Sequence, residues 1–517
     1  MFSRKTQTEV CGTAVSSGIL LHPTSLPGPY GVGDLGPQAY RFVDWLASTG
    51  CKLWQILPLG PTGYGDSPYQ CFSAFAGNPY LVSPDELFAD GLLTQSDLDS
   101  MKDPPASSPL ARLRVDFGLV IPKKLNLLLT AYRRFKTSPK SLRDSFHYFC
   151  AENAHWLDDF ALFMSLKESN GGGAWNGWTA DLRSRKKSAL DNAKKELAES
   201  IERYSFYQFL FFKQWGKLRK YAGEKGIQIM GDVPIFVAYD SADVWANPEL
   251  FFLDENGNPT VVAGVPPDLF SATGQLWGNP LYNWEVHKRD GYKWWLSRVR
   301  SALQAVDILR LDHFRGFAGY YEIPASHPTA EHGRWVPGPG ADLFKAIDAD
   351  LGNGIIAPGT GLPIVAEDLG LITPDVIQLL EAFDLPGMKV LQFAFSGPDN
   401  PFLPHNYVPN CVAYTGTHDN DTAMGWLATA PEQEKDFALR YLGVDGQSFA
   451  WDLIRAAWKS VAVLAIAPMQ DVLSLDGSAR MNFPSRLGGN WGWRMSEDDL
   501  REDLAAGLRD LNWMTLR

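Results

Sequence analysis

The stretch Ile308–Phe317, ILRLDHFRGF, begins with apolar residues and ends with charged ones. Its first half is typical of a buried strand. Arg310 and Asp312 are two residues apart, so on a strand their side chains point to the same face. Arg310 would favour the ionised form of Asp312, and an ionised carboxylate can act as a covalent nucleophile. The alternative is a structural ion pair at the end of a strand.

The same pattern, an apolar run that ends at a carboxylate, occurs three more times. Asp232 follows a run in IQIMGDVPIF, Glu367 follows one in LPIVAEDLG, and Asp419 lies just beyond one in CVAYTGTHDND. In chain order with Asp312, these carboxylates are 80, 55 and 52 residues apart, which leaves room for one or two strand–helix units each. Because α/β barrels build active sites at the C-terminal ends of several strands, the pattern predicts such a barrel.

The rest of the chain indicates the same fold class. Residues 18–57 read as strand, loop, helix and strand, which favours a parallel sheet. Later runs at 388–395, 412–415 and 463–467 are predicted as further strands. We therefore expect an α/β protein with a (β/α)8 TIM barrel, as a single catalytic domain over residues 1–517. A final helix at 497–511 leaves no room for a C-terminal β-domain.

Two insertions into the barrel are expected. Residues 85–205 alternate charge runs with short apolar groups, which indicates a mostly helical insertion subdomain with solvated faces. Residues 240–285 are the second expected insertion. Within it, the segment 264–280 is rich in Gly and Pro and is predicted to be a loop.

Composition excludes several classes of function. The chain has 517 residues and a net charge of −12, which argues against a nucleic-acid partner because phosphate contacts need a basic surface. Five cysteines without a CxxC pair indicate reduced thiols in a reducing compartment. The nine histidines include no HExxH motif. We therefore expect no metal site and no cofactor.

No membrane partner is expected either. The longest apolar run near the C-terminus, Val461–Ala467, is far too short to span a bilayer. Residues 1–15 lack the apolar segment of a secretory signal. These features predict a cytoplasmic location, or the plastid stroma if the source is a plant or alga.

The motifs RLDHFRGF, IVAEDLG and TGTHDND, with GDVPIF upstream, resemble conserved regions of the 4-α-glucanotransferases, also called amylomaltases or disproportionating enzymes. That family lies within the α-amylase-like group. GILLHPTSLPGPYGVGDLG, GYGDSPYQCFSAFAGNPYL and GVPPDLFSATGQLWGNPLYNW are similar to it too. The likeness extends from about Gly18 to Arg494. It implies an enzyme that disproportionates maltooligosaccharides and other α-1,4-glucans, with glucose among its acceptors.

Retaining exchange of α-glucosidic bonds needs a carboxylate nucleophile and a carboxyl acid/base. We assign Asp312 as the nucleophile, because Arg310 keeps it charged, and Glu367 as the general acid/base, because burial after an apolar run would raise its pKa. Asp419 is assigned as the third carboxylate, which binds sugar hydroxyls. The resemblance supplies the candidate substrate-binding residues, which are Tyr64, Ser67, Tyr69, Asp232, Asp268, Gln275, Trp277, Arg310, His313 and His418.

Within that set the resemblance implies different positions. Ser67 and Tyr69 would line the sugar site, and Tyr64 would belong to an outer glucan-binding surface. The resemblance also implies that residues 240–285 form an active-site lid region, in which Asp268, Gln275 and Trp277 touch the glucan. The chain departs from the usual family pattern at Cys71, to which we assign no role, and at Leu269, where many members carry Tyr. The second departure leaves the fine shape of the lid open.

Two other functions remain open at the level of the sequence. An α-glucan hydrolase would carry the same three carboxylates, although most α-amylase-like hydrolases also have a C-terminal β-domain. An inactive glucan-binding protein would keep the aromatic surface without turnover, and the intact carboxylates argue against it.

Overall fold

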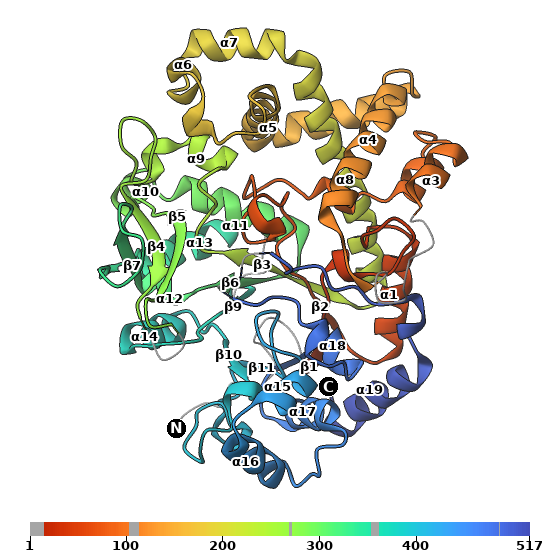
Figure 1. The fold of residues 1–517 in the computed structure, drawn as a ribbon, viewed down its shortest axis with the longest axis vertical. Helices are drawn as coiled ribbons and strands as arrows, with labels where there is room; N and C mark the ends of the chain where they lie inside the picture. The colour runs from red at the N-terminus through yellow and green to blue at the C-terminus, as the bar shows by residue number, and fades with distance from the viewer. Residues whose placement is uncertain (1–14, 103–112, 268–270, 353–360, 485, 487) are drawn as a thin grey trace.

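The computed structural model describes residues 15–102, 113–267, 271–352, 361–484, 486 and 488–517 (Figure 1). Across these residues one sheet of eight parallel strands has the order β10-β11-β12-β1-β2-β3-β6-β9. Its strands are β1 (Ser16–Leu20), β2 (Leu53–Gln55), β3 (Gln228–Pro234), β6 (Ile308–Asp312), β9 (Ile364–Ala366), β10 (Gly387–Val390), β11 (Cys411–Tyr414) and β12 (Leu464–Pro468).

The sheet closes almost completely on itself. β1 pairs with β2 on one side and with β12 on the other, with Gly18 opposite Ile466. Between β9 and β10, the Ala366 amide donates to the Pro386 carbonyl at 2.9 Å and the Met388 amide donates to the Asp368 carboxylate at 2.6 Å. The predicted (β/α)8 barrel is confirmed.

The strands form because their sequences are apolar on both faces, as strands of a parallel sheet covered by helices require. In β6, Ile308, Leu309 and Leu311 are each about 1% exposed. The carboxylates Asp312, Glu367 and Asp419 lie at or beyond the C-terminal ends of their strands. One edge of the barrel therefore collects the charged groups.

Helices cover the outside of the barrel, and a group of them extends away from it. α1 (Pro37–Ser48), α11 (Lys293–Ala305), α17 (Phe449–Lys459) and α19 (Glu502–Thr515) belong to the barrel layer. Between β2 and β3, the structure has α2 (Pro84–Ala89), α3 (Gln95–Met101), α4 (Phe117–Phe135), α5 (Lys140–Ser169), α6 (Ala180–Arg183), α7 (Lys187–Glu196) and α8 (Ala198–Glu224). Figure 1 shows α5, α6 and α7 at one end of the molecule and α16 (Glu432–Leu442) at the other. None of the helices that the structure describes has the length and apolar character to cross a membrane.

A second sheet corrects the prediction of a loop over residues 264–280. β4 (Val261–Val265) and β5 (Gln275–Pro280) pair antiparallel, and β7 (Gly319–Pro324) and β8 (Arg334–Pro337) extend the sheet. The Gly and Pro residues indicated turns, but β-forming side chains and a close backbone approach at Gly264 build a hairpin. A Cβ at Gly264 would lie 2.2 Å from the Gln275 carbonyl oxygen.

Two further expectations are refined. The strand predicted over 388–395 ends at Val390, where the 3-10 helix η7 (Leu391–Phe393) follows. After β12, the described residues contain the helices α18 (Met469–Val472) and α19 and no strand, so no C-terminal β-domain is present there.

Gly264→Ala should destabilise the protein by about 1–3 kcal/mol, because the new methyl group clashes with the backbone of β5. The matched control is Gly216→Ala in α8, where a Cβ meets no atom within 4 Å. That change should stabilise by about 0.5–1 kcal/mol, since Ala is the better helix former. Urea unfolding of both variants measures the difference. Equal stability of the two variants would contradict the assigned pairing of β4 and β5.

Candidate active site

The four carboxylates predicted from the strand ends meet at one edge of the barrel. Asp232 lies in β3, Asp312 ends β6, Glu367 directly follows β9, and Asp419 lies in the loop after β11. A cleft of about 910 Å³ opens there. Eight of the candidate residues line it, namely Ser67, Tyr69, Gln275, Trp277, Asp312, His313, His418 and Asp419.

Arg310 connects two of these carboxylates. Its Nη1 atom lies 2.9 Å from Asp312 Oδ1 and 2.6 Å from Asp232 Oδ2. The register of the sheet causes this arrangement, because Arg310 on β6 lies opposite Asp232 on β3. Burial would lower the pKa of Arg310, but Asp232 and Asp312 raise it above its usual value. The guanidinium therefore remains charged between the two carboxylates.

The two partners of Arg310 differ in exposure. The side chain of Asp232 is 0% exposed, whereas that of Asp312 is 28% exposed and lines the cleft. Tyr69 also donates to Asp232 Oδ2 at 2.8 Å. Asp232 is therefore a buried partner of Arg310 and Tyr69. Asp312 is the carboxylate that a ligand can reach from the cleft.

Glu367 is placed beside Asp312 by the next strand. The register pairs Leu311 of β6 with Ala366 of β9. Asp312 and Glu367 are the next residues after this pair, so they lie next to each other at the ends of neighbouring strands. The carboxylate of Glu367 accepts from the amides of His313 at 2.7 Å and Leu369 at 2.9 Å. Burial, and then the charge of Asp312, raise the pKa of Glu367 to about 8. At neutral pH Glu367 therefore carries a proton that it can donate.

Asp419 has the opposite character. Asn482 donates to Asp419 Oδ1 at 2.6 Å, and His418 Nε2 lies 3.3 Å from Oδ2. Burial would raise the pKa of Asp419, but His418 and Asn482 lower it below its usual value. The ring of His418 also stacks on that of Tyr69, with 5.0 Å between centroids. Asp419 is thus held ionised at the wall of the cleft.

His313 has a strained backbone next to the candidate nucleophile. Its φ angle is +53°, in the left-handed region that residues other than glycine seldom adopt. The ring meets Trp277 edge-on at 4.7 Å between centroids, and the Trp277 indole donates to Gln275 at 3.1 Å. Burial lowers the pKa of His313 to about 4, so the ring is neutral at pH 7.

The other candidates have different locations. Arg310, Asp232 and Glu367 contact cleft residues as described above. The backbone of Tyr64 lies in the 3-10 helix η2 (Tyr64–Asp66). Asp268 lies outside the described residues, as does Leu269. Cys71 donates through Sγ to the Pro68 carbonyl at 2.9 Å.

The structure adds cleft residues that the sequence reasoning missed, which are Gln70, Phe236, Asn279, Asn482 and Trp491. Asn482 and Trp491 come from the Gly- and aromatic-rich segment after β12. A loop that follows a barrel strand lies on the C-terminal face, so the position of this segment was a usable signal. Among the described residues, no group of three or more His, Cys, Asp or Glu side chains could hold a metal ion.

Known proteins resemble this chain over nearly its whole length. A family model described as 4-alpha-glucanotransferase matches residues 21–500. The 4-alpha-glucanotransferase of Thermus thermophilus is 52% identical over 511 residues, which cover 97% of this chain and 98% of that protein. The chloroplastic/amyloplastic 4-alpha-glucanotransferase of Solanum tuberosum is 45% identical, over 96% of this chain and 84% of that protein. The amylomaltase from Streptococcus agalactiae in complex with acarbose superposes with a TM-score of 0.92 at 40% identity, covering 97% of this chain and 99% of that one.

The pKa of Glu367 makes stability depend on pH. Because that pKa is raised from 4.5 to about 8, the fold favours the protonated form. Below pH 4.5, Glu367 is protonated in both the folded and the unfolded protein and does not lower the free energy of unfolding. As the pH rises from 4.5 towards 8, it lowers the free energy of unfolding increasingly. At pH 5, the melting temperature of Glu367→Gln should be close to that of the unmodified protein. At pH 9, the variant should have the higher melting temperature. Differential scanning fluorimetry measures both. A temperature difference that does not change with pH would contradict the raised pKa.

Proposed function

The chain belongs to the family of 4-alpha-glucanotransferases, and we propose that it disproportionates maltooligosaccharides by a retaining double displacement through a glycosyl ester on Asp312. The family membership makes the protein a glycosyltransferase that acts on alpha-1,4-glucans. The observation that carries the finer proposal is the pair of carboxyl groups on adjacent strands. Asp312 is paired with Arg310, whereas Glu367 has a pKa raised to about 8.

In the first step Asp312 attacks the anomeric carbon of a bound glucan. One oxygen of Asp312 pairs with Arg310 at 2.9 Å, and the side chain is accessible from the cleft. As the glycosidic bond breaks, Glu367 gives its proton to the leaving oxygen. The shorter glucan departs, and the donor part remains as an ester on Asp312.

In the second step the direction of proton transfer reverses. Glu367, now ionised, takes the proton from the 4-hydroxyl of an acceptor, and that oxygen attacks the ester carbon. Asp312 leaves as a carboxylate, which restores the starting state. Asp419 and His418 hydrogen-bond sugar hydroxyls, and the negative charge of Asp419 favours the cationic transition state.

The remaining candidates bind the glucan in this proposal. Ser67, Tyr69, Gln275, Trp277 and His313 contact the sugars from the cleft wall, with Asp232 and Arg310 positioning the carboxylates. Tyr64 is proposed to belong to an outer glucan-binding surface, and Asp268 to touch the glucan as Gln275 and Trp277 do. Glucose and shorter maltooligosaccharides serve as acceptors. The acarbose complex of the similar amylomaltase supports a cleft that binds sugar chains.

The same proposal treats residues 1–517 as one catalytic unit. Residues 85–205 form its inserted helical subdomain, and residues 240–285, which include β4 and β5, contribute a lid over the cleft. A lid that excludes water gives the ester time to meet a sugar hydroxyl. An α-glucan hydrolase would use the same carboxylates, so products decide between the two functions.

Asp312→Asn should fold normally and lose turnover by a factor of about a thousand or more, because the amide cannot form the ester. The matched control is Asp342→Asn, which changes an exposed carboxylate paired with Lys288. Release of glucose from maltotriose measures both, with circular dichroism to confirm the fold. Wild-type turnover in Asp312→Asn would remove Asp312 from the mechanism.

Maltotriose alone should separate transfer from hydrolysis. We expect glucose and a ladder of longer maltodextrins, with the number of reducing ends nearly constant, since each bond that breaks is remade. An oriented acceptor site favours this outcome, because it raises the effective concentration of the sugar hydroxyl. Chromatography of the products, with a reducing-end assay, makes the measurement. If the number of reducing ends rises in step with the loss of maltotriose, the protein is a hydrolase and the transferase proposal is wrong.

A further inference from the structure

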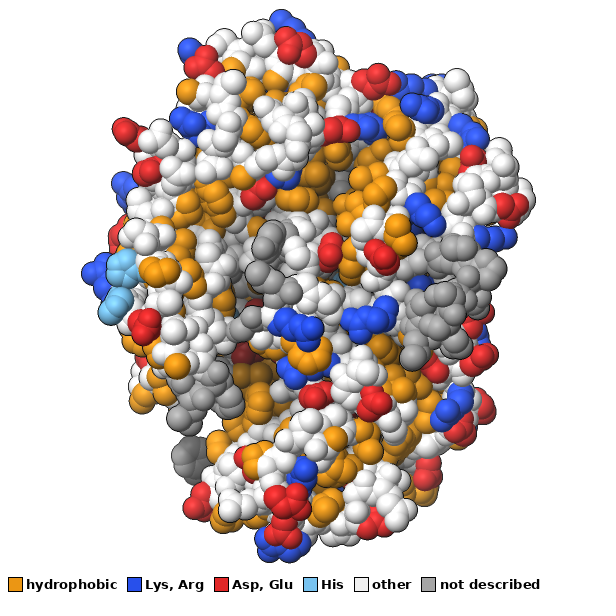
Figure 2. Space-filling view, in the orientation of Figure 1, with side chains coloured by type: hydrophobic (Ala, Val, Ile, Leu, Met, Phe, Trp, Pro, Cys, Tyr) orange, Lys and Arg blue, Asp and Glu red, His pale blue; other side chains and the backbone are white. Residues whose placement is uncertain are grey.

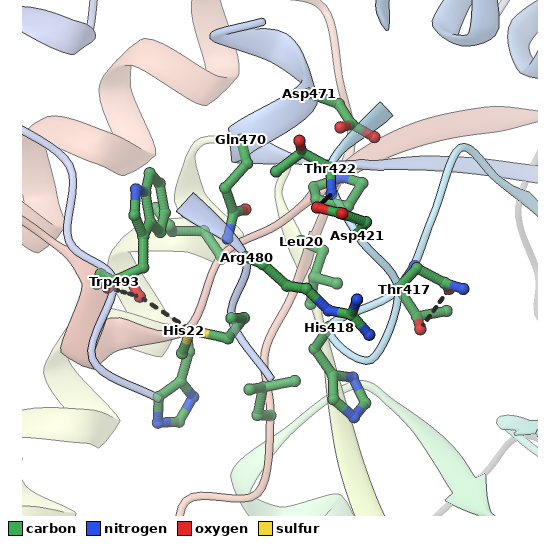
Figure 3. Close-up of a pocket in the computed structure, with 16 residues that line it drawn as sticks. Leu20, His22, Thr417, His418, Asp421, Thr422, Gln470, Asp471, Arg480 and Trp493 are labelled. Carbon is green, nitrogen blue, oxygen red and sulfur yellow. Dashed lines mark hydrogen bonds between the residues drawn. The ribbon is translucent and has the colours of Figure 1, made fainter. Parts of the chain in front are cut away.

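A second cavity, whose lining residues are drawn in Figure 3, has His418 in its wall. Its walls come from the ends of β1, β11 and β12 and from the segment 480–493. His418 lines both this cavity and the cleft. More of the cavity surface is apolar than polar, and its polar lining residues include His22, Thr417, Asp421, Gln470, Asp471 and Arg480. The cavity and the cleft therefore share the His418 side chain as a lining residue.

Several polar groups of the cavity wall have protein partners. Asp471 accepts from the Thr415 hydroxyl at 2.5 Å and from the Ala423 amide at 2.7 Å. Arg480 donates to the Asp419 carbonyl at 2.6 Å. These hydrogen bonds connect Asp471 and Arg480 of the cavity wall to β11 and the segment after it, which includes Asp419.

His22 differs from these residues. It is 6% exposed, and its Nδ1 atom is buried without a hydrogen-bond partner. An unpaired polar atom in a protein interior is costly unless water pairs with it. Ordered water is stable in a cavity when each molecule finds two to four polar partners. Ser25, Thr417 and Asn420 are polar residues that line the cavity together with His22.

We propose that this cavity holds ordered water, and that His22 is a positioning residue which acts through this water to keep His418 solvated and directed towards Asp419. The proposal rests on the proposed function, in which His418 and Asp419 bind sugar hydroxyls. His22 would thus affect catalysis although it is not one of the residues that line the cleft.

The charges around His418 agree with this role. The titratable and charged groups near it are His22, Tyr69, Asp232, Arg310, Asp419, Asp421, Asp471 and Arg480. Burial lowers the pKa of His22 to about 3, with His418 as the second cause, so His22 is uncharged. Burial would also lower the pKa of His418, but Asp419 raises it above its usual value. Water behind His418 favours the charged imidazole, since burial is the effect that opposes it.

Three variants test the role of His22. His22→Leu replaces the imidazole by an apolar side chain and removes the partner of the water. His22→Gln keeps a donor and an acceptor. Met481→Leu is the matched control, because Met481 lines the same cavity without a polar nitrogen or oxygen atom. The measurements are kcat and KM on maltotriose, the NMR titration of His418, and a high-resolution crystal structure of the unmodified protein.

We expect His22→Leu to lower kcat about tenfold with KM within about twofold, because the contacts of His418 and Asp419 strengthen in the transition state. His418 should lose its proton at a lower pH in this variant, since a drier cavity disfavours the charged ring. His22→Gln and Met481→Leu should remain close to the unmodified protein in both measurements. The crystal structure should show water within hydrogen-bond distance of His22 Nδ1.

A cavity without water in that crystal structure would overturn the proposal, and this result does not depend on whether His22→Leu folds. Wild-type kcat and an unchanged His418 titration in a folded His22→Leu would also overturn it. An equal loss of kcat in Met481→Leu would assign the effect to packing instead. The crystal structure and the titration need no turnover, so they separate a failure of this proposal from a failure of the proposed function.

Discussion

The contact of the Arg310 guanidinium with two carboxylates on two strands is the interaction on which the site depends. A buried cation is stable only with anionic partners, and a buried carboxylate only with a donor. Asp232 and Asp312 meet both needs at 2.6 and 2.9 Å. Because the partners come from β3 and β6, the ion pairs also fix the register where the strands end. Removing Arg310 would leave Asp232 buried without its cation.

The arrangement shifts the pKa of Glu367 upwards and the pKa of Asp419 downwards. Asp312 and Asp419 each lie beside a positive or hydrogen-bonding partner, whereas the partners of Glu367 are two backbone amides. Burial and the charge of Asp312 therefore raise the pKa of Glu367. Acidic and basic side chains are interspersed over the face of the molecule seen in Figure 2.

The sequence predicted the features that depend on local pattern. The sequence predicted the apolar strands of the barrel, because parallel strands are apolar throughout. It also predicted the carboxylates at the strand ends, because barrels place their functional residues at the C-terminal edge. The sheet formed by β4, β5, β7 and β8 could not be predicted, because its central pair, β4 with β7, joins residues 61 positions apart (Val262 with Ile323) through tertiary contacts. Asn482 and Trp491 were missed although they follow the last barrel strand, a position that places a loop on the C-terminal face, because the sequence does not show which residues of that loop reach the cleft.

The pairing of β1 with β12 has a consequence for the synthesis of the protein. Gly18 finds its partner Ile466 only when almost the entire chain has been made, and Arg517 donates to the Ser16 carbonyl at 3.0 Å. Until then β1 presents an unpaired edge, which is a site for pairing with other chains. Contacts of such large sequence separation form slowly. The nascent chain therefore passes through a long interval in which aggregation competes with closure of the barrel.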